Sequence, residues 1–127
     1  MVIEHIAVFY RDLEAARVFF EQYFGAASNT RYENPKTGFR SYFLTFDSGA
    51  RLEIMSRADV GEGEKQTERT GYSHMAFALG SSEAVKCLTE RLRADGFPVI
   101  REPRTTGDGY FESCVLDPEG NRIELTV

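Results

Sequence analysis

Cysteine is scarce in this chain of 127 residues, and long apolar runs are missing altogether. Two cysteines, Cys87 and Cys114, do not make the disulfide framework of a small secreted domain, so we expect two buried free thiols. No apolar run approaches the roughly 20 residues that span a bilayer, and the first residues carry no secretion signal. These absences favour a cytoplasmic protein without a membrane partner.

An excess of basic charge is also missing. The net charge is −5, and acidic and basic residues are interspersed. Nucleic acids and anionic membranes attract basic surfaces, so we expect neither of them as the main partner. The length fits a single domain, 1–127, that can bury a sizeable core. A small molecule is the class of ligand that these properties leave open.

The two halves of the sequence repeat one pattern of secondary structure. Each half opens with a strand-like segment, 3–10 or 72–79, and continues into a helical pattern, 11–24 or 81–95. Asp12 and Ser82 stand where helix N-caps belong, and Gly25 and Gly96 stand where the helices would end. Apolar stripes are predicted along both helices: Leu13, Ala16, Phe20 and Phe24, then Val85, Leu88 and Leu92.

Three more strand-like runs follow each predicted helix. They cover about 26–33, 39–46 and 50–56 in the first half, and about 98–105, 110–116 and 121–127 in the second. Turn sequences separate the runs, as in NPKTG, DSGA, TGDG and DPEG. The sequence therefore predicts an α+β fold of two tandem βαβββ modules, 1–57 and 71–127, joined by a polar linker at 58–70.

Both histidines of the chain fall on the first strand of a module, and a glutamate falls on each last strand. His5 and Glu53 belong to the first module, and His74 and Glu124 hold the equivalent places in the second. Side chains alternate between the two faces of a strand, so the apolar neighbours can pack on a helix while these four residues face the other way. Two imidazoles and two carboxylates suit one divalent ion, such as Ni, Zn, Co, Mn or Fe.

A structural alternative exists for each of the four residues. A single strand histidine is usually structural, and a strand glutamate usually faces water. The equivalent placement of all four residues favours a metal site instead. The small residues Ala7 and Ala76, each two positions after a histidine, would leave room on the same face.

At these residues the chain resembles the vicinal oxygen chelate superfamily. That superfamily includes glyoxalase I, methylmalonyl-CoA epimerase, fosfomycin-resistance proteins, extradiol dioxygenases and bleomycin-binding proteins. The resemblance spans essentially the whole chain and is most specific in GYSHMAF, 71–77, and DPEGNRIEL, 117–125. It implies a curved mixed β-sheet cup with the helices outside, and a homodimer whose metal sites lie within one chain or across two.

A His-Glu-His-Glu quartet looks most like glyoxalase I. In that family a divalent ion, with Ni or Zn favoured, binds the oxygens of a hemithioacetal formed from a thiol and a 2-oxoaldehyde. A ligand carboxylate moves a proton between adjacent carbons, and the resemblance implies Glu124 for this role, or else Glu53. The alternatives are another enzyme of the superfamily (an epimerase, a dioxygenase or a fosfomycin-type thiol transferase) and a non-catalytic resistance module that binds a small molecule.

Four residues are weaker candidates for contacts with the substrate. Glutathione-dependent members commonly carry Arg four residues after the first ligand and Asn four residues after the second, where this chain has Phe9 and Arg57. Arg11 and Arg57 either bind another anionic group or lie in solvent. Phe9 and Tyr110 either line a pocket or belong to the core. These departures leave the identity of the thiol open.

Overall fold

A computed structural model describes residues 1–63, 65 and 70–127 of the chain. The chain divides into two compact units, Met1–Gly63 and Glu64–Val127. The division falls within the predicted linker, of which residues 64 and 66–69 lie outside the described part. Two sheets and two helices make up the regular structure of the described ranges, which confirms the predicted α+β class. Neither helix is long and apolar enough to cross a membrane.

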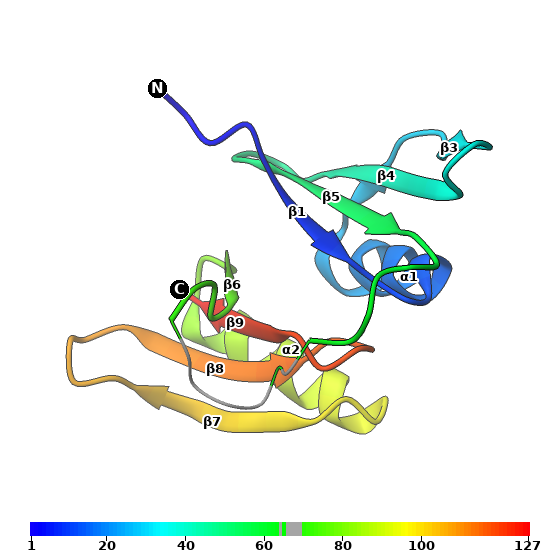
Figure 1. Cartoon of the computed structure of the whole chain (residues 1–127). Helices are drawn as coiled ribbons and strands as arrows, with labels where there is room; N and C mark the ends of the chain where they lie inside the picture. Colours follow the sequence, from blue (N-terminus) through cyan, green and yellow to red (C-terminus); the bar gives the residue numbers. More distant parts are fainter. Residues whose placement is uncertain (64, 66–69) are drawn as a thin grey trace. The chain divides into compact units, whose positions relative to one another are not determined.

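The first unit is built on a mixed sheet with one helix. Its elements are β1 (His5–Phe9), α1 (Leu13–Phe24), β2 (Ala27–Ser28), β3 (Tyr32–Asn34), β4 (Phe39–Thr45) and β5 (Arg51–Ser56). The strand order is β1-β5-β4-β2, with β3 also pairing to β4. Strand β1 runs parallel to β5, and the other pairs are antiparallel (Figure 1).

The second unit has the predicted βαβββ order. Its elements are β6 (Met75–Ala78), α2 (Ser82–Ala94), β7 (Val99–Thr105), β8 (Phe111–Leu116) and β9 (Arg122–Thr126). The strand order is β6-β9-β8-β7, and β6 runs parallel to β9 (Figure 1). In both units, therefore, the first strand lies at a sheet edge and pairs with the last strand of its own module.

The strand predicted at 26–33 is instead two short strands, β2 and β3. Asn29 lies between them, and its backbone N–H donates to the carbonyl of Phe43 at 3.1 Å. The side-chain Oδ1 of Asn29 accepts the backbone N–H of Phe43 at 2.8 Å. A side-chain carbonyl thus takes the place of a backbone carbonyl in the ladder, which interrupts the regular pairing with β4.

The helix boundaries follow the predicted caps, with one shift. Asp12 caps α1 by accepting the N–H of the third residue after it at 2.9 Å, and Gly25 ends the helix in the left-handed conformation, with φ 64°. The N-cap of α2 is Ser81, not Ser82. Ser81 has an extended backbone and its hydroxyl accepts the N–H of Ala84 at 3.1 Å, whereas Ser82 is already the first helical residue.

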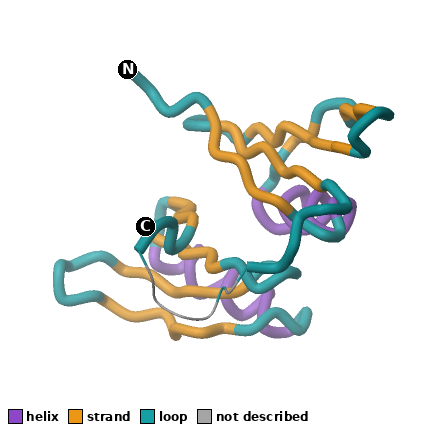
Figure 2. The backbone as a smooth tube through the Cα atoms, in the orientation of Figure 1, coloured by secondary structure: helices purple, strands orange, loops and turns teal. Residues whose placement is uncertain are grey.

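Each helix covers one face of the sheet in its own unit (Figure 2). The buried apolar side chains between helix and sheet are Leu13, Ala16, Phe19, Phe20, Leu44, Leu52 and Ile54 in the first unit, and Val85, Leu92, Val115, Ile123 and Leu125 in the second. Cys114 is buried as expected, but Cys87 is exposed because it lies on α2 away from this stripe. Along β5 and β9 the buried residues face the helices, and the alternate residues, which include Glu53 and Glu124, face the other way.

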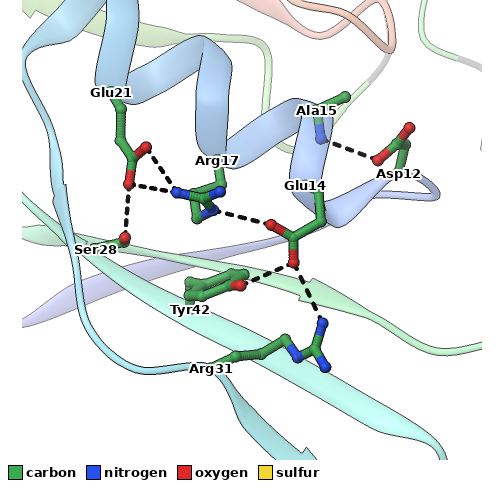
Figure 3. A network of polar contacts seen from close by, with 8 residues as sticks. All are labelled: Asp12, Glu14, Ala15, Arg17, Glu21, Ser28, Arg31 and Tyr42. Atoms are coloured by element: carbon green, nitrogen blue, oxygen red, sulfur yellow. Dashed lines mark hydrogen bonds and ion pairs between the residues drawn. The ribbon is translucent and has the colours of Figure 1, made fainter.

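A polar network fastens α1 to the strands of the first unit (Figure 3). The hydroxyl of Tyr42 donates to Glu14 at 2.8 Å, and Arg17 bridges Glu14 at 3.0 Å and Glu21 at 2.8 Å. Ser28 also donates to Glu21, at 2.6 Å. The hydrogen bond from Tyr42, followed by that from Arg17, holds the pKa of Glu14 below its ordinary value. Burial, followed by the bond to Glu14, raises the pKa of Tyr42.

Candidate metal centre

His74 and Glu124 lie together in the second unit. The ring Nε2 of His74 is 3.5 Å from Oε2 of Glu124. The carboxylate is the more sheltered partner, with 14% of its side chain exposed against 36% for the imidazole. His74 was predicted on the first strand but immediately precedes β6. The parallel pairing of β6 with β9 brings the two residues together, because it sets Ala76 directly opposite Glu124.

His5 and Glu53 form the same arrangement in the first unit. The ring Nε2 of His5 is 3.9 Å from Oε2 of Glu53, and the exposed fractions of the side chains are 39% and 15%. Here Ala7 lies directly opposite Glu53. In each module, then, the histidine stands two residues before the alanine that faces the glutamate. Both alanines are exposed, as the prediction of room on this face requires.

The predicted alternation of sheltered and exposed side chains holds well in three of the four strands next to the His–Glu pairs. Leu52 and Ile54, which flank Glu53, are buried, as are the residues that flank Glu124. Along β6 the exposure alternates as predicted. Along β1 the alternation is weaker, because Ile6 on this edge strand is 39% exposed. The faces that carry the carboxylates are thus well defined in both sheets.

Each histidine has a further polar neighbour at its other ring nitrogen. The Nδ1 of His5 is hydrogen-bonded to the carboxylate of Glu4, which also accepts a hydrogen bond from Arg51. The Nδ1 of His74 lies 3.2 Å from the hydroxyl of Ser73. The bonds from His5 and then Arg51 hold the pKa of Glu4 below its ordinary value, so Glu4 is present as a carboxylate. Glu4 and Ser73 were not predicted from the sequence, although each directly precedes a histidine.

Cys114 was also missed as a neighbour of the candidate site. It lies directly opposite Glu124 in the antiparallel pairing of β8 with β9. Burial raises the pKa of the thiol, and the charge of Glu124 adds to this effect. A neutral thiol is a poor nucleophile, so Cys114 fills space beside the carboxylate. The equivalent place in the first unit belongs to Phe43, which lies opposite Glu53.

The four weaker candidates for substrate contact have different surroundings in the structure. Phe9 shares the face of Ala7 and is 38% exposed, so it is open to a ligand on the side that carries His5. Arg11 forms an ion pair with Glu62.

The other two candidates lie in a loop and in a turn. Arg57 forms an ion pair with Asp59. Tyr110 is 61% exposed in the turn that joins β7 to β8. It lies four residues before Cys114, which corresponds to about 13 Å along a strand. Tyr110 and the His74–Glu124 pair therefore occupy different parts of the second unit.

The donor sets of both pairs fit a divalent metal ion. Imidazole nitrogen and carboxylate oxygen bind such ions at about 2.0–2.2 Å, which puts neighbouring ligand atoms about 3 Å apart. The separations of 3.5 and 3.9 Å are slightly wider, and a small side-chain movement brings either pair to that distance. No group of three or more His, Cys, Asp and Glu side chains suited to a metal is found among the described residues. Each unit offers one imidazole and one carboxylate as candidate ligands.

The comparisons with known proteins identify the family. The chain belongs to the Glyoxalase/Bleomycin resistance protein/Dioxygenase superfamily, whose sequence profile matches residues 2–125. This confirms the resemblance to the vicinal oxygen chelate proteins. The uncharacterized protein YqjT of Bacillus subtilis is 28% identical over 126 residues, which cover 97% of this chain and 96% of YqjT.

Two plant enzymes are similar to this chain over part of their length. Lactoylglutathione lyase of Arabidopsis thaliana is 29% identical over 130 residues, covering 95% of this chain and 42% of the enzyme. Glyoxalase I from Zea mays superposes with a TM-score of 0.81 at 22% identity, covering 98% of this chain and 44% of the maize chain. This chain spans less than half of either plant enzyme, and the superposition shows a shared fold.

Proposed function

We propose that this protein is a metal-dependent lyase or isomerase of the glyoxalase I type. Its substrate would be the hemithioacetal of a 2-oxoaldehyde and a thiol. The observation that carries the proposal is the recurrence of one His–Glu pair at the same register of both modules. Under this proposal His5, Glu53, His74 and Glu124 hold one divalent ion, either within a chain or across two chains of a homodimer.

The metal ion and the carboxylates have separate roles in this proposal. A bound divalent ion acts as a Lewis acid, which makes it easier to withdraw a proton from carbon beside a carbonyl. Glu124 accepts the proton from the carbon that bears sulfur and returns it to the former carbonyl carbon. The product is an isomer of the substrate, so the reaction needs no redox partner. Glu53 is the second choice for the same role.

The partial burial of Glu124 is compatible with a role as the base. With 14% of its side chain exposed, the carboxylate is partly withdrawn from water, and a proton that it receives exchanges with solvent more slowly than at an open surface. Cys114 beside it is neutral and buried. Glu53 is similarly sheltered, at 15%, but its neighbour across the strands is Phe43. The two carboxylates therefore differ mainly in what lies opposite them.

The contacts of the arginines bear on which thiol is used. Arg11 and Arg57 are paired with Glu62 and Asp59 in the first unit, so an anionic thiol would have to displace an acidic side chain to bind them. Phe9 offers an apolar surface where glutathione-dependent members commonly have Arg. We therefore propose a thiol other than glutathione, and a screen of thiols of different charge is the appropriate assay.

The proposal is tested by turnover of the metal-loaded protein. Protein loaded in turn with Ni, Zn, Co, Mn or Fe is given methylglyoxal adducts of several thiols, and the formation of the thioester is followed. We expect turnover with at least one combination, and its loss in Glu124→Gln but not in Glu90→Gln, a change of an exposed carboxylate on α2. An absence of turnover with every thiol and metal would refute the lyase proposal.

The same samples distinguish the alternative functions. Oxygen consumption with ferrous iron would indicate a dioxygenase, and addition of a thiol to fosfomycin would indicate a thiol transferase. Epimerisation of a carbon acid without a thiol would indicate an epimerase. Binding of a small molecule that does not depend on His5 or His74 would indicate a non-catalytic module. The mass of the protein in solution, measured by light scattering, tests the proposed homodimer.

A further inference from the structure

In both units, Nδ1 of the candidate histidine contacts the residue that precedes it, and Nε2 faces the glutamate. In His5, Nδ1 is bonded to Glu4 and Nε2 faces Glu53 at 3.9 Å. In His74, Nδ1 lies 3.2 Å from the hydroxyl of Ser73 and Nε2 faces Glu124 at 3.5 Å. The flanking residues are different in kind, yet both engage Nδ1. In both units, therefore, Nε2 is the ring nitrogen that faces the glutamate.

We propose that Glu4 is a positioning residue that selects Nε2 as the metal-binding nitrogen of His5, and that Ser73 holds the ring of His74 with its Nε2 toward Glu124. The inference rests on the proposed function, because it takes the two histidines as ligands. A neutral imidazole carries one proton, and the hydrogen bond made by one nitrogen decides which nitrogen keeps a free electron pair. A carboxylate only accepts hydrogen bonds, so Glu4 requires the proton of His5 to be on Nδ1. Nε2 is then free to bind a metal ion.

The first unit holds Glu4 by contacts from a neighbouring strand. The guanidinium of Arg51 donates to the carboxylate of Glu4, and the backbone N–H of Arg51 donates to the carbonyl of Glu4 at 3.0 Å. The same guanidinium lies 4.3 Å from the ring centre of Phe43. The ring of His5 meets Phe43 edge-on, with ring centres 5.4 Å apart. His5 and the arginine that binds Glu4 thus contact the same aromatic ring.

The second unit holds its histidine less firmly. The hydroxyl of Ser73 can accept a hydrogen bond from Nδ1 or donate one to it, so it permits either tautomer of the ring of His74. Cys114 occupies the place of Phe43 in the register and gives the imidazole no aromatic surface. A carboxylate partner also raises the basicity of a ligating histidine, which a hydroxyl does less. The two units therefore differ, and Glu4 is the stronger positioning residue.

The protonation site of the ring gives a direct test that needs no metal. Long-range proton–nitrogen NMR correlations of metal-free protein at about pH 9, where an imidazole ordinarily carries one proton, report which nitrogen holds it. The chain has two histidines, so His74→Asn leaves the signals of His5 alone. We expect the Nδ1–H form in the wild type and in Glu4→Gln, whose amide oxygen still accepts the bond. Glu4→Ala should shift the ring toward the Nε2–H form.

Metal affinity gives the second readout on the same variants. In competition titrations with Zn²⁺, Glu4→Ala should weaken binding by about 10- to 100-fold. Ser73→Ala should weaken it less, and Glu33→Ala, which removes an exposed carboxylate from β3, should leave it unchanged. An Nε2–H form of His5 in the wild type overturns the inference, and so does wild-type affinity in Glu4→Ala while His5→Ala loses affinity. If His5→Ala also binds like the wild type, the metal site itself is refuted.

Discussion

The imidazole Nε2 of His74 lies 3.5 Å from the carboxylate Oε2 of Glu124. Neither residue is near the other in sequence, and the parallel pairing of β6 with β9 creates the contact. The first unit repeats it between β1 and β5. The imidazoles are partly exposed, at 36% and 39%, and the carboxylates are more sheltered. The chemistry of the four side chains suits a divalent ion, which is the role proposed for them.

Lowering the pH should reduce the free energy of unfolding, in part through protonation of Glu14. The folded state lowers the pKa of Glu14 below its ordinary value of 4.5, chiefly through the hydrogen bond from Tyr42. Below that value the unfolded chain takes up the proton first, so stability is present above it and is lost as the pH falls through the folded pKa. The free energy of unfolding, measured in urea from about pH 7 to pH 3, should therefore fall less in Glu14→Gln than in the wild type. A constant difference between the two proteins would contradict this account.

Removing the buried hydroxyl of Thr89 should cost more stability than removing the buried hydroxyl of Ser113. Thr89 donates to the carbonyl of Val85 at 2.6 Å, so Ser113 must be the donor in the 2.7 Å bond between the two hydroxyls. Thr89→Val leaves the hydroxyl of Ser113 without its acceptor and should cost about 1–3 kcal/mol, whereas Ser113→Ala should cost about 1 kcal/mol. The double variant should be more stable than Thr89→Val alone. Equal and additive losses in urea unfolding would show that the pair is not coupled in this way.

Ser56 offers a contrast to Ser113. The residue is 3% exposed, and its Oγ has no hydrogen-bond partner within the described part of the chain. A buried hydroxyl without a partner costs free energy, so Ser56→Ala should leave the free energy of unfolding unchanged or raise it by up to about 1 kcal/mol. A loss comparable to that of Ser113→Ala would indicate that the Ser56 hydroxyl has a partner.

The fold was largely predictable because its signals are local. Apolar periodicity, Asp12 and Gly25 define α1, and the repeat in the second half made the module order visible. The split strand was not predictable, because it depends on a bond between Asn29 and Phe43, which are distant in sequence. The shift from Ser82 to Ser81 depends on backbone angles, since adjacent serines have the same chemistry.

The candidate site was predictable in its residue types but not in its surroundings. The repeat placed each histidine on the same face as a glutamate, and the structure brings each pair within 4 Å. Glu4 and Ser73 gave no signal, because their role depends on which ring nitrogen they contact. The acidic partners of Arg11 and Arg57 lie in the loop after β5, where no periodic pattern restricts side chains.

Metal titration of single ligand variants tests the central claim most directly. Metal-free protein is titrated with Zn²⁺ or Co²⁺ for the wild type and for His5→Ala, Glu53→Gln, His74→Ala and Glu124→Gln, with Glu90→Gln as the control. We predict one ion per chain in the wild type and the control, and a loss of affinity of more than about tenfold in all four ligand variants. Wild-type affinity in the four variants, or an effect confined to the residues of one module, would contradict a shared metal centre.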